Sequence, residues 1–183
     1  MSSRQIFKSQ WRSPDEVREL LQSLFVAEVV VPSRTIWLVS PWITDLPVVD
    51  NRAGTFAGLS PRWAPRQIRL TEVLEQLLEY GSQVVIATRP VPHNDQVLTE
   101  MQDAIDRLGV PAEQLIIHRT EDLHQKGVLG DDYYLSGSMN LTYNGVEILE
   151  ETLRFDVGPA VVAEARITFA TRWGGTLQQV DQS

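Results

Sequence analysis

The sequence predicts an α/β fold in which helices flank a mainly parallel β-sheet. Short runs rich in β-branched and aromatic residues alternate along the chain with longer runs of helical periodicity. Prolines and glycines separate the two kinds of run. With 183 residues, 43% of them apolar, the chain is long enough to bury a core without disulfides or a structural metal. We therefore expect residues 1–183 to form a single domain.

The first half of the chain contains a helix, a strand and a long loop. A helix is expected over residues 14–30, because Ser13 is a suitable N-cap, Pro14 suits the first helical position and apolar residues recur at helical spacing. Residues 35–42, TIWLVSPW, have the pattern of a buried strand. Residues 44–66 are interrupted by glycines and prolines and predict an irregular loop. A loop of this length is often functional.

The second half continues the alternation of helices and strands. A helix over residues 70–80 and a strand over 83–89 complete a βαβ unit with the preceding strand. A helix over 94–108 is followed by a strand over 114–119. Two short apolar runs on either side of the turn sequence GDD then predict a β-hairpin over residues 126–138.

The predicted hairpin would gather four polar side chains on one face. If its turn centres on Asp131, His124 lies opposite Ser138. Because side chains alternate along a strand, Lys126 and Asn140 would then share the face of His124. The opposite face would carry the aliphatic residues Leu123, Leu129 and Leu135.

These four residue types suit the chemistry of a phosphodiester. Histidine can act as a nucleophile or carry a proton near neutral pH, and lysine and asparagine can hold phosphoryl oxygens. A metal site would need several His, Asp, Glu or Cys ligands, and this cluster contains a lysine and one histidine. We therefore expect neither a metal nor another cofactor.

The charge of the chain limits which partners it can bind without a local site. Its net charge of −8 opposes non-specific attraction to nucleic acid or anionic lipid. Residues 52–69 contain no acid and supply Arg52, Arg62 and Arg66 as candidate substrate-binding residues, and Trp63 could stack on a nucleobase. The alternative is a solvated loop with scattered arginines. Two other tryptophans, Trp37 and Trp42, are expected in the core or in a pocket wall.

The residues from His124 to Asn140 match a known motif. They resemble the pattern HxKx4Dx6GSxN of the phospholipase D superfamily and carry all of its fixed residues, with five residues instead of six between Asp131 and Gly137, and Glu151 stands where small members of that family have a glutamate. TIWLVSPWITD, GSQVVIATRP and AEARITFATRWGG resemble the family's first strand, its second strand and its last helix. The resemblance covers most of the chain, with residues 45–67 as the main departure. It implies a mixed, mainly parallel β-sheet flanked by helices.

The resemblance also implies a role for each motif residue. His124 would be the nucleophile that forms a phosphohistidine, or the general acid that protonates the leaving oxygen. Lys126 and Asn140 would bind the phosphate oxygens, and Ser138 would support them. The activity implied is that of a metal-independent phosphodiesterase.

The resemblance further implies roles for Glu151 and Asp131 and a dimeric site. Glu151 would hold the second imidazole nitrogen and fix its tautomer, whereas Asp131, at the turn, would be structural. The chain has one copy of the motif, and family enzymes use two histidines. A homodimer is therefore expected, in which symmetry supplies the second histidine.

The expected substrate is nucleic acid, with DNA favoured. Short phospholipase D superfamily members with a single motif are most often nucleases, and the chain resembles these members. The segments RQIFKSQ, SPWITDLPVVDNRAG and IRLTEVLEQLLEYG resemble a phospholipase D-like protein of bacterial deazapurine DNA modification and restriction clusters, which implies a defence setting with partner subunits. The alternatives are a non-catalytic nucleic-acid-binding or scaffold subunit, and a phospholipid hydrolase or transphosphatidylase. No apolar run approaches the roughly 20 residues of a membrane span, so a cytoplasmic location is expected.

Overall fold

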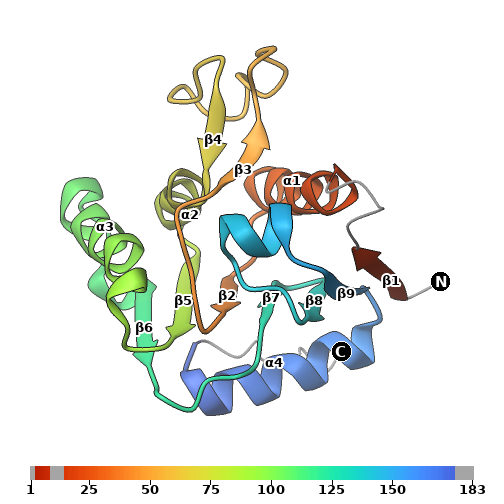
Figure 1. Ribbon diagram of the computed structural model, residues 1–183. Helices are drawn as coiled ribbons and strands as arrows, with labels where there is room; N and C mark the ends of the chain where they lie inside the picture. Colours follow the sequence, from red (N-terminus) through yellow and green to blue (C-terminus); the bar gives the residue numbers. More distant parts are fainter. Residues whose placement is uncertain (1–2, 9–14, 176–183) are drawn as a thin grey trace, which may run out of the picture.

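A computed structural model describes residues 3–8 and 15–175 of the chain, so the predicted cap at Ser13 and Pro14 lies outside the described residues (Figure 1). Seven strands form the central sheet, in the order β1-β9-β8-β7-β2-β5-β6. The strands are β1 (Ser3–Lys8), β2 (Thr35–Val39), β5 (Gln83–Thr88), β6 (Leu115–Arg119), β7 (Gly127–Leu129), β8 (Tyr134–Gly137) and β9 (Glu151–Asp156).

The sheet is mixed and helices flank it, which confirms the predicted fold class. Strands β2, β5 and β6 are parallel neighbours. They are connected by α2 (Leu70–Glu79) and α3 (Pro92–Leu108), so the βαβ unit forms as predicted. Strands β7, β8, β9 and β1 add antiparallel pairs on the other side of β2. The parallel pairing is therefore limited to three strands.

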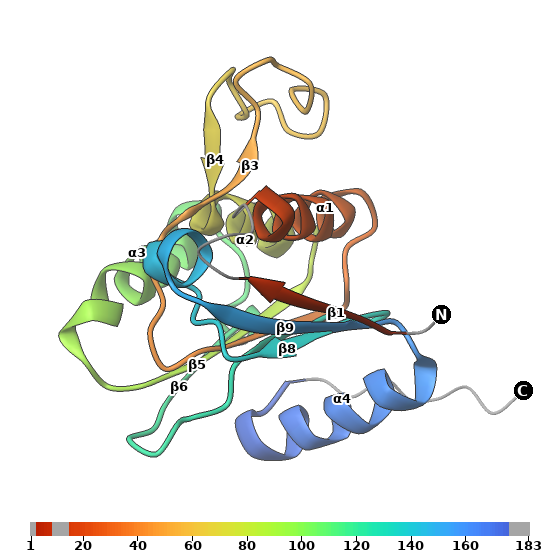
Figure 2. The ribbon, with the colours of Figure 1, turned by 45° about the vertical axis from the view of Figure 1, so that its right-hand side comes forward.

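The helices cover the two faces of the sheet unequally. Helices α1 (Asp15–Val30), α2 and α3 lie on one face, and α4 (Pro159–Trp173) lies alone on the other (Figure 2). Short helical turns are present at Ala112–Gln114 and at Asn144–Ile148. None of the described helices is long and apolar enough to cross a membrane.

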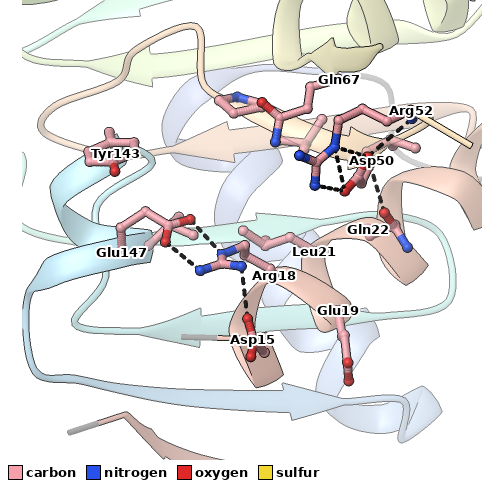
Figure 3. Close-up of a pocket in the computed structure, with 14 residues that line it drawn as sticks. Asp15, Arg18, Glu19, Leu21, Gln22, Asp50, Arg52, Gln67, Tyr143 and Glu147 are labelled. Carbon is pink, nitrogen blue, oxygen red and sulfur yellow. Dashed lines mark hydrogen bonds and ion pairs between the residues drawn. The ribbon is translucent and has the colours of Figure 1, made fainter. Parts of the chain in front are cut away.

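The segment predicted as an irregular loop contains one strand of a two-stranded ribbon, and the other strand directly follows it. Strands β3 (Pro47–Asp50) and β4 (Gln67–Arg69) pair antiparallel and project beyond the helical layer (Figures 1 and 2). The Asp50 backbone N–H donates to Gln22 Oε1 of α1 at 2.8 Å, which joins the ribbon to the helix (Figure 3). The prediction of a loop is thus wrong at Pro47–Asp50, and the strand Gln67–Arg69 after the loop was not predicted, because both strands are short and have no regular sequence pattern.

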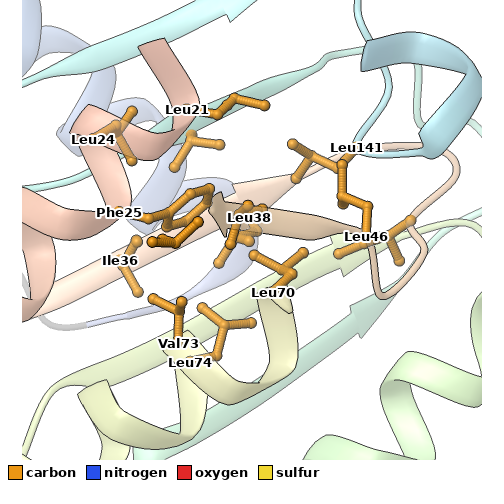
Figure 4. Close-up of a cluster of buried hydrophobic side chains, with 14 of the residues drawn as sticks. Leu21, Leu24, Phe25, Ile36, Leu38, Leu46, Leu70, Val73, Leu74 and Leu141 are labelled. Atoms are coloured by element: carbon orange, nitrogen blue, oxygen red, sulfur yellow. The ribbon is translucent and has the colours of Figure 1, made fainter. Parts of the chain in front are cut away.

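The core lies on both faces of β2. All five residues of this strand are buried, and alternate side chains enter different layers. Leu38 packs with Phe25 and Leu74 under α1 and α2 (Figure 4), whereas Trp37 packs with Phe169 under α4. A strand covered on both faces needs a continuous apolar run, and each fully buried large side chain stabilises the fold by about 1.5–3 kcal/mol.

The β7–β8 hairpin forms, but its predicted register is wrong by one residue. Gly127 pairs with Ser136, and Leu129 pairs with Tyr134. The turn is closed by the Gly130 N–H, which donates to Tyr133 O at 3.1 Å. The centre of the turn therefore lies between Asp131 and Asp132 and not at Asp131. As a consequence, the predicted leucines do not share a face: Leu123 and Leu129 pack toward α4, and Leu135 packs toward α1 and α2.

Candidate active site

The topology of the sheet brings several chain segments to one edge. Strands β2 and β5 are parallel and in register, so both end at this edge. Strand β7 runs antiparallel to β2 and therefore begins there, β8 returns there, and β9 begins there. Loops at the carboxyl ends of parallel strands are common binding sites. The segment 124–126, the segment 138–140 and Glu151 all lie at these strand ends.

His124 and Lys126 lie in the extended segment that leads into β7. The His124 side chain is exposed, and its Nδ1 lies 3.3 Å from Arg89 Nη2. Lys126 is half-buried and its Nζ donates to the carbonyl oxygen of His124 at 2.9 Å. His124 and Lys126 both precede Gly127, the first paired residue of the hairpin. The error in the predicted register therefore does not determine the direction of their side chains.

The structure places Ser138 in contact with Glu151, and Asn140 beside Ser40. The Ser138 hydroxyl donates to a carboxylate oxygen of Glu151 and accepts the Thr152 N–H at 3.0 Å. Asn140 Oδ1 lies 3.5 Å from Ser40 Oγ, a buried hydroxyl at the end of β2. Within the described residues, Glu151 does not contact the imidazole, so its predicted hold on the second ring nitrogen is not made in this conformation.

A buried lysine, Lys8, lies opposite the buried Glu151 on the neighbouring strand. Lys8, at the end of β1, lies opposite Glu151 in the register and donates from Nζ to Gly145 O at 2.9 Å. Burial lowers the pKa of the Lys8 ammonium, and the carboxylates of Glu147 and Glu151 act in the opposite direction. Lys8 could not be predicted as part of this site, because its partner Gly145 is more than 130 residues away in the chain.

Asp131 lies in the hairpin turn, away from the motif's polar groups. Its carboxylate accepts the Arg34 N–H at 3.0 Å, and its own N–H donates to Ser33 Oγ at 2.8 Å. Arg166 of α4 forms an ion pair with the same carboxylate at 3.8 Å. These contacts tie the turn to the start of β2 and to α4, which is the arrangement expected of a structural aspartate.

Gly137 allows β8 and β9 to approach closely beside Ser138. Its φ of +151° and its position leave no room for a Cβ, which would meet the carbonyl oxygen of Thr152 well inside van der Waals distance. Gly137→Ala is therefore expected to displace Ser138 and to lower the free energy of unfolding by about 1–3 kcal/mol. Chemical denaturation measures this loss. Gly58→Ala is the matched control, because a Cβ there meets nothing within 4 Å; equal losses in both variants would contradict the explanation.

A groove is lined by Asn140 and by two exposed aromatic residues. It has a volume of about 360 Å³ and is lined by Trp42, Thr44, His93, Asn140, Thr142, Tyr143, Asn144 and Leu149. The side chains of Trp42 and Tyr143 are 40% and 57% exposed. Trp42 is thus a pocket wall, and Trp37, with no exposed surface, is a core residue, both as predicted.

Comparison with solved structures gives neighbours of the whole chain. The phospholipase D family member Nuc from Salmonella typhimurium superposes with a TM-score of 0.58 at 12% identity, over 94% of this chain and 93% of Nuc. NucT from Helicobacter pylori superposes with a TM-score of 0.55 at 13% identity, over 92% of this chain and 94% of NucT. The chain has the phospholipase D fold. No sequence model of a protein family and no curated protein sequence matches it.

The fold is shared with a lipid enzyme as well. A phosphatidylserine synthase from Haemophilus influenzae Rd KW20 superposes with a TM-score of 0.55 at 15% identity, over 93% of this chain but 38% of the synthase. Similarity at this level of identity establishes the phospholipase D fold and not the substrate. The choice among substrates therefore depends on the residues of this chain.

The arginines of residues 52–69 do not form an uncompensated basic patch on the phospholipase D fold. Arg52 pairs with Asp50 at 2.6 Å, Arg62 with Glu79 at 2.7 Å and Arg66 with Glu72 at 2.5 Å. The ribbon that carries them points to the top of Figure 1, whereas the arrowheads of β5 and β6 point down. Their role in substrate binding stays a prediction, and a substrate would have to extend across the molecule to reach them.

Trp63 is not available for stacking. It is 3% exposed and packs in the core cluster under the ribbon, and its carbonyl oxygen accepts from Asn51 Nδ2 at 3.2 Å. The prediction that this ring stacks on a nucleobase is therefore wrong. A large apolar ring in a segment rich in turns is more stable when it anchors the segment than when it stays in water.

A second hollow, between α1, the ribbon and residues 143–147, lies apart from the motif. It has a volume of about 500 Å³. Arg18 crosses it to bind Glu147 at 2.8 and 2.9 Å and Asp15 at 2.8 Å (Figure 3). Because the arginine that projects into it is already bound by two carboxylates, the hollow is a poor site for a phosphate.

Proposed function

We propose that the chain is a metal-independent phosphodiesterase that cleaves nucleic acid, with DNA as the favoured substrate, in the cytoplasm. The observation that carries this proposal is the convergence of the motif residues at one sheet edge of the phospholipase D fold, with the imidazole of His124 exposed beside Lys126. Ser138 and Asn140 end at the same edge. A nucleophile and phosphate-binding donors in one open site are the parts that phosphodiester cleavage requires.

The proposed reaction has two steps. In the first, Nε2 of His124 attacks phosphorus, a P–N bond forms and the P–O bond to the leaving oxygen breaks. The partner subunit's His124 gives its proton to that oxygen, so a homodimer supplies both nucleophile and acid. In the second, the partner subunit's His124 takes a proton from water, the water oxygen attacks phosphorus, and the P–N bond breaks to restore the imidazole. Lys126 and Asn140 would bind the non-bridging oxygens in both steps.

The groove beside Asn140 supports nucleic acid as the substrate. The exposed rings of Trp42 and Tyr143 border it, and bases that are not paired stack on aromatic side chains with about 1–3 kcal/mol per base. The resemblance to a protein of DNA modification and restriction clusters supports DNA in a defence setting, with partner subunits. We propose these contexts together with the activity.

A cleavage assay on a panel of substrates tests the proposal. Single-stranded DNA, double-stranded DNA, RNA and phosphatidylcholine vesicles are each incubated with the chain, and we expect turnover of nucleic acid and none of the vesicles. Turnover of the lipid alone would support the hydrolase alternative, and turnover of no substrate would support the non-catalytic alternative.

Removing the exposed ring should weaken nucleic-acid cleavage in particular. Trp42→Leu keeps the position apolar but deletes the stacking surface, so kcat/KM for single-stranded DNA should fall by roughly 5- to 100-fold. The matched control is methyl p-nitrophenyl phosphate, a diester without a base, for which the variant should lose less than about threefold. Equal losses on the two substrates would show that Trp42 serves the site in another way.

A further inference from the structure

Arg89 contacts the imidazole ring of the candidate nucleophile. It lies just after β5, and its Nη2 is 3.3 Å from His124 Nδ1. Its Nε donates to Leu123 O at 3.0 Å, and its guanidinium lies 5.2 Å from the centre of the Trp42 ring. Three separate contacts therefore hold the guanidinium in place between the groove and His124.

A hydrogen bond from Asn94 also holds the backbone of Arg89 in place. Asn94, which is fully buried at the start of α3, donates from Nδ2 to Arg89 O at 2.9 Å and to Pro41 O at 3.0 Å. Its Oδ1 accepts the Ile43 N–H at 2.9 Å. One buried amide thus joins the loops after β2 and β5, so Arg89 and Trp42 have a fixed position relative to each other.

The contact between Arg89 and His124 determines the tautomer of the ring. A guanidinium can only donate hydrogen bonds and does not lose its proton in proteins. Nδ1 must therefore be the acceptor, and in the neutral ring the proton lies on Nε2. A ring in this form can give a proton from Nε2 but has no lone pair there for attack on phosphorus.

We infer that Arg89 is a positioning residue for His124, which holds the ring in the Nε2–H form in the free chain and moves its donors to a phosphate oxygen when substrate binds. This inference rests on the proposed function. A guanidinium has five N–H donors in a planar fork that matches a phosphate, and the contacts above use two of them. Among the described ion pairs, none involves Arg89, so no carboxylate competes with the phosphate for it.

Nitrogen-15 NMR of the imidazole rings tests the inference without any activity assay. The chain has three histidines, so the spectrum is simple, and His124→Ala assigns the signal. At about pH 8.5, where a free imidazole is neutral, wild-type His124 should give the Nε2–H pattern. Arg89→Gln should remove that preference, and thymidine 5′-monophosphate added to wild type should do the same. An unchanged pattern in both experiments would overturn the inference.

Kinetics give a second readout that separates this inference from the proposed function. If nucleic acid is cleaved, Arg89→Gln should raise KM at least about tenfold and change kcat less than about threefold, as for the loss of a phosphate contact. Arg119→Gln is the matched control, because Arg119 ends the neighbouring strand β6 and is exposed in a pair with Asp95. Cleavage with equal KM in both variants would overturn the role of Arg89 and leave the proposed function intact, whereas absent cleavage with the predicted tautomer would do the reverse.

Discussion

His124→Ala is expected to abolish phosphodiester cleavage, with kcat lower by roughly 10³-fold or more, while the protein remains folded. The side chain is exposed and contacts Arg89 at the open edge of the sheet, not the core. The free energy of unfolding should therefore change by less than about 0.5 kcal/mol. Cleavage of single-stranded DNA and chemical denaturation measure the two effects.

A second histidine provides the matched control for this variant. His118 lies in β6, pairs in register with Ala87 and is exposed, so His118→Ala should leave cleavage within about twofold of wild type. If the two variants lost activity equally, His124 would not be the nucleophile. If His124→Ala retained activity, the motif would not be the site of the reaction.

Mixing the inactive variant with wild type tests the dimeric site. A heterodimer has one His124 and so lacks either the nucleophile or the acid. Activity should therefore fall faster than the wild-type fraction, approaching its square when subunits exchange freely. A linear decline, or a species that light scattering shows to be strictly monomeric and that still cleaves, would contradict a site shared by two copies.

The helices and the buried strands could be predicted from the sequence because their signals are local. The periodicity of residues 15–30 and the continuous apolar run of β2 both reflect which side chains must leave water. The hairpin register could not be predicted in the same way. It depends on the position of the turn, which Ser33 and Arg34 fix from another part of the chain.

The candidate site likewise contains residues that could be predicted from local sequence and residues that could not. The motif from His124 to Asn140 is contiguous, so the sequence alone was sufficient to predict that its residues lie close together. Arg89, Trp42 and Lys8 reach this edge from other strands, and no spacing in the sequence connects them with the motif. The pairing of Arg62 and Arg66 could not be predicted for a related reason, because their carboxylate partners, Glu79 and Glu72, come from the following helix.

Cleavage is expected to proceed at an unchanged rate in excess EDTA. In the proposed reaction, Lys126 and Asn140 from two subunits neutralise the charge that develops on the phosphoryl oxygens, and in other enzymes a divalent cation does this. Among residues 3–8 and 15–175, no group of three or more His, Asp or Glu side chains is placed to hold a metal ion. The prediction itself is tested by initial rates at rising EDTA concentration, with and without added magnesium.

Lys126→Met provides the matched variant for the same experiment. Methionine keeps most of the side-chain length and removes the charge, so kcat/KM should fall by roughly 10²-fold or more if the ammonium stabilises the transition state. Magnesium should not restore the activity of this variant, because nothing in the proposed reaction uses it. Wild-type activity that vanishes with EDTA and returns with magnesium would show that the phosphoryl charge is neutralised by a metal and would overturn this account of the chemistry. Activity that survives chelation in wild type and is lost in Lys126→Met would assign that task to the lysine.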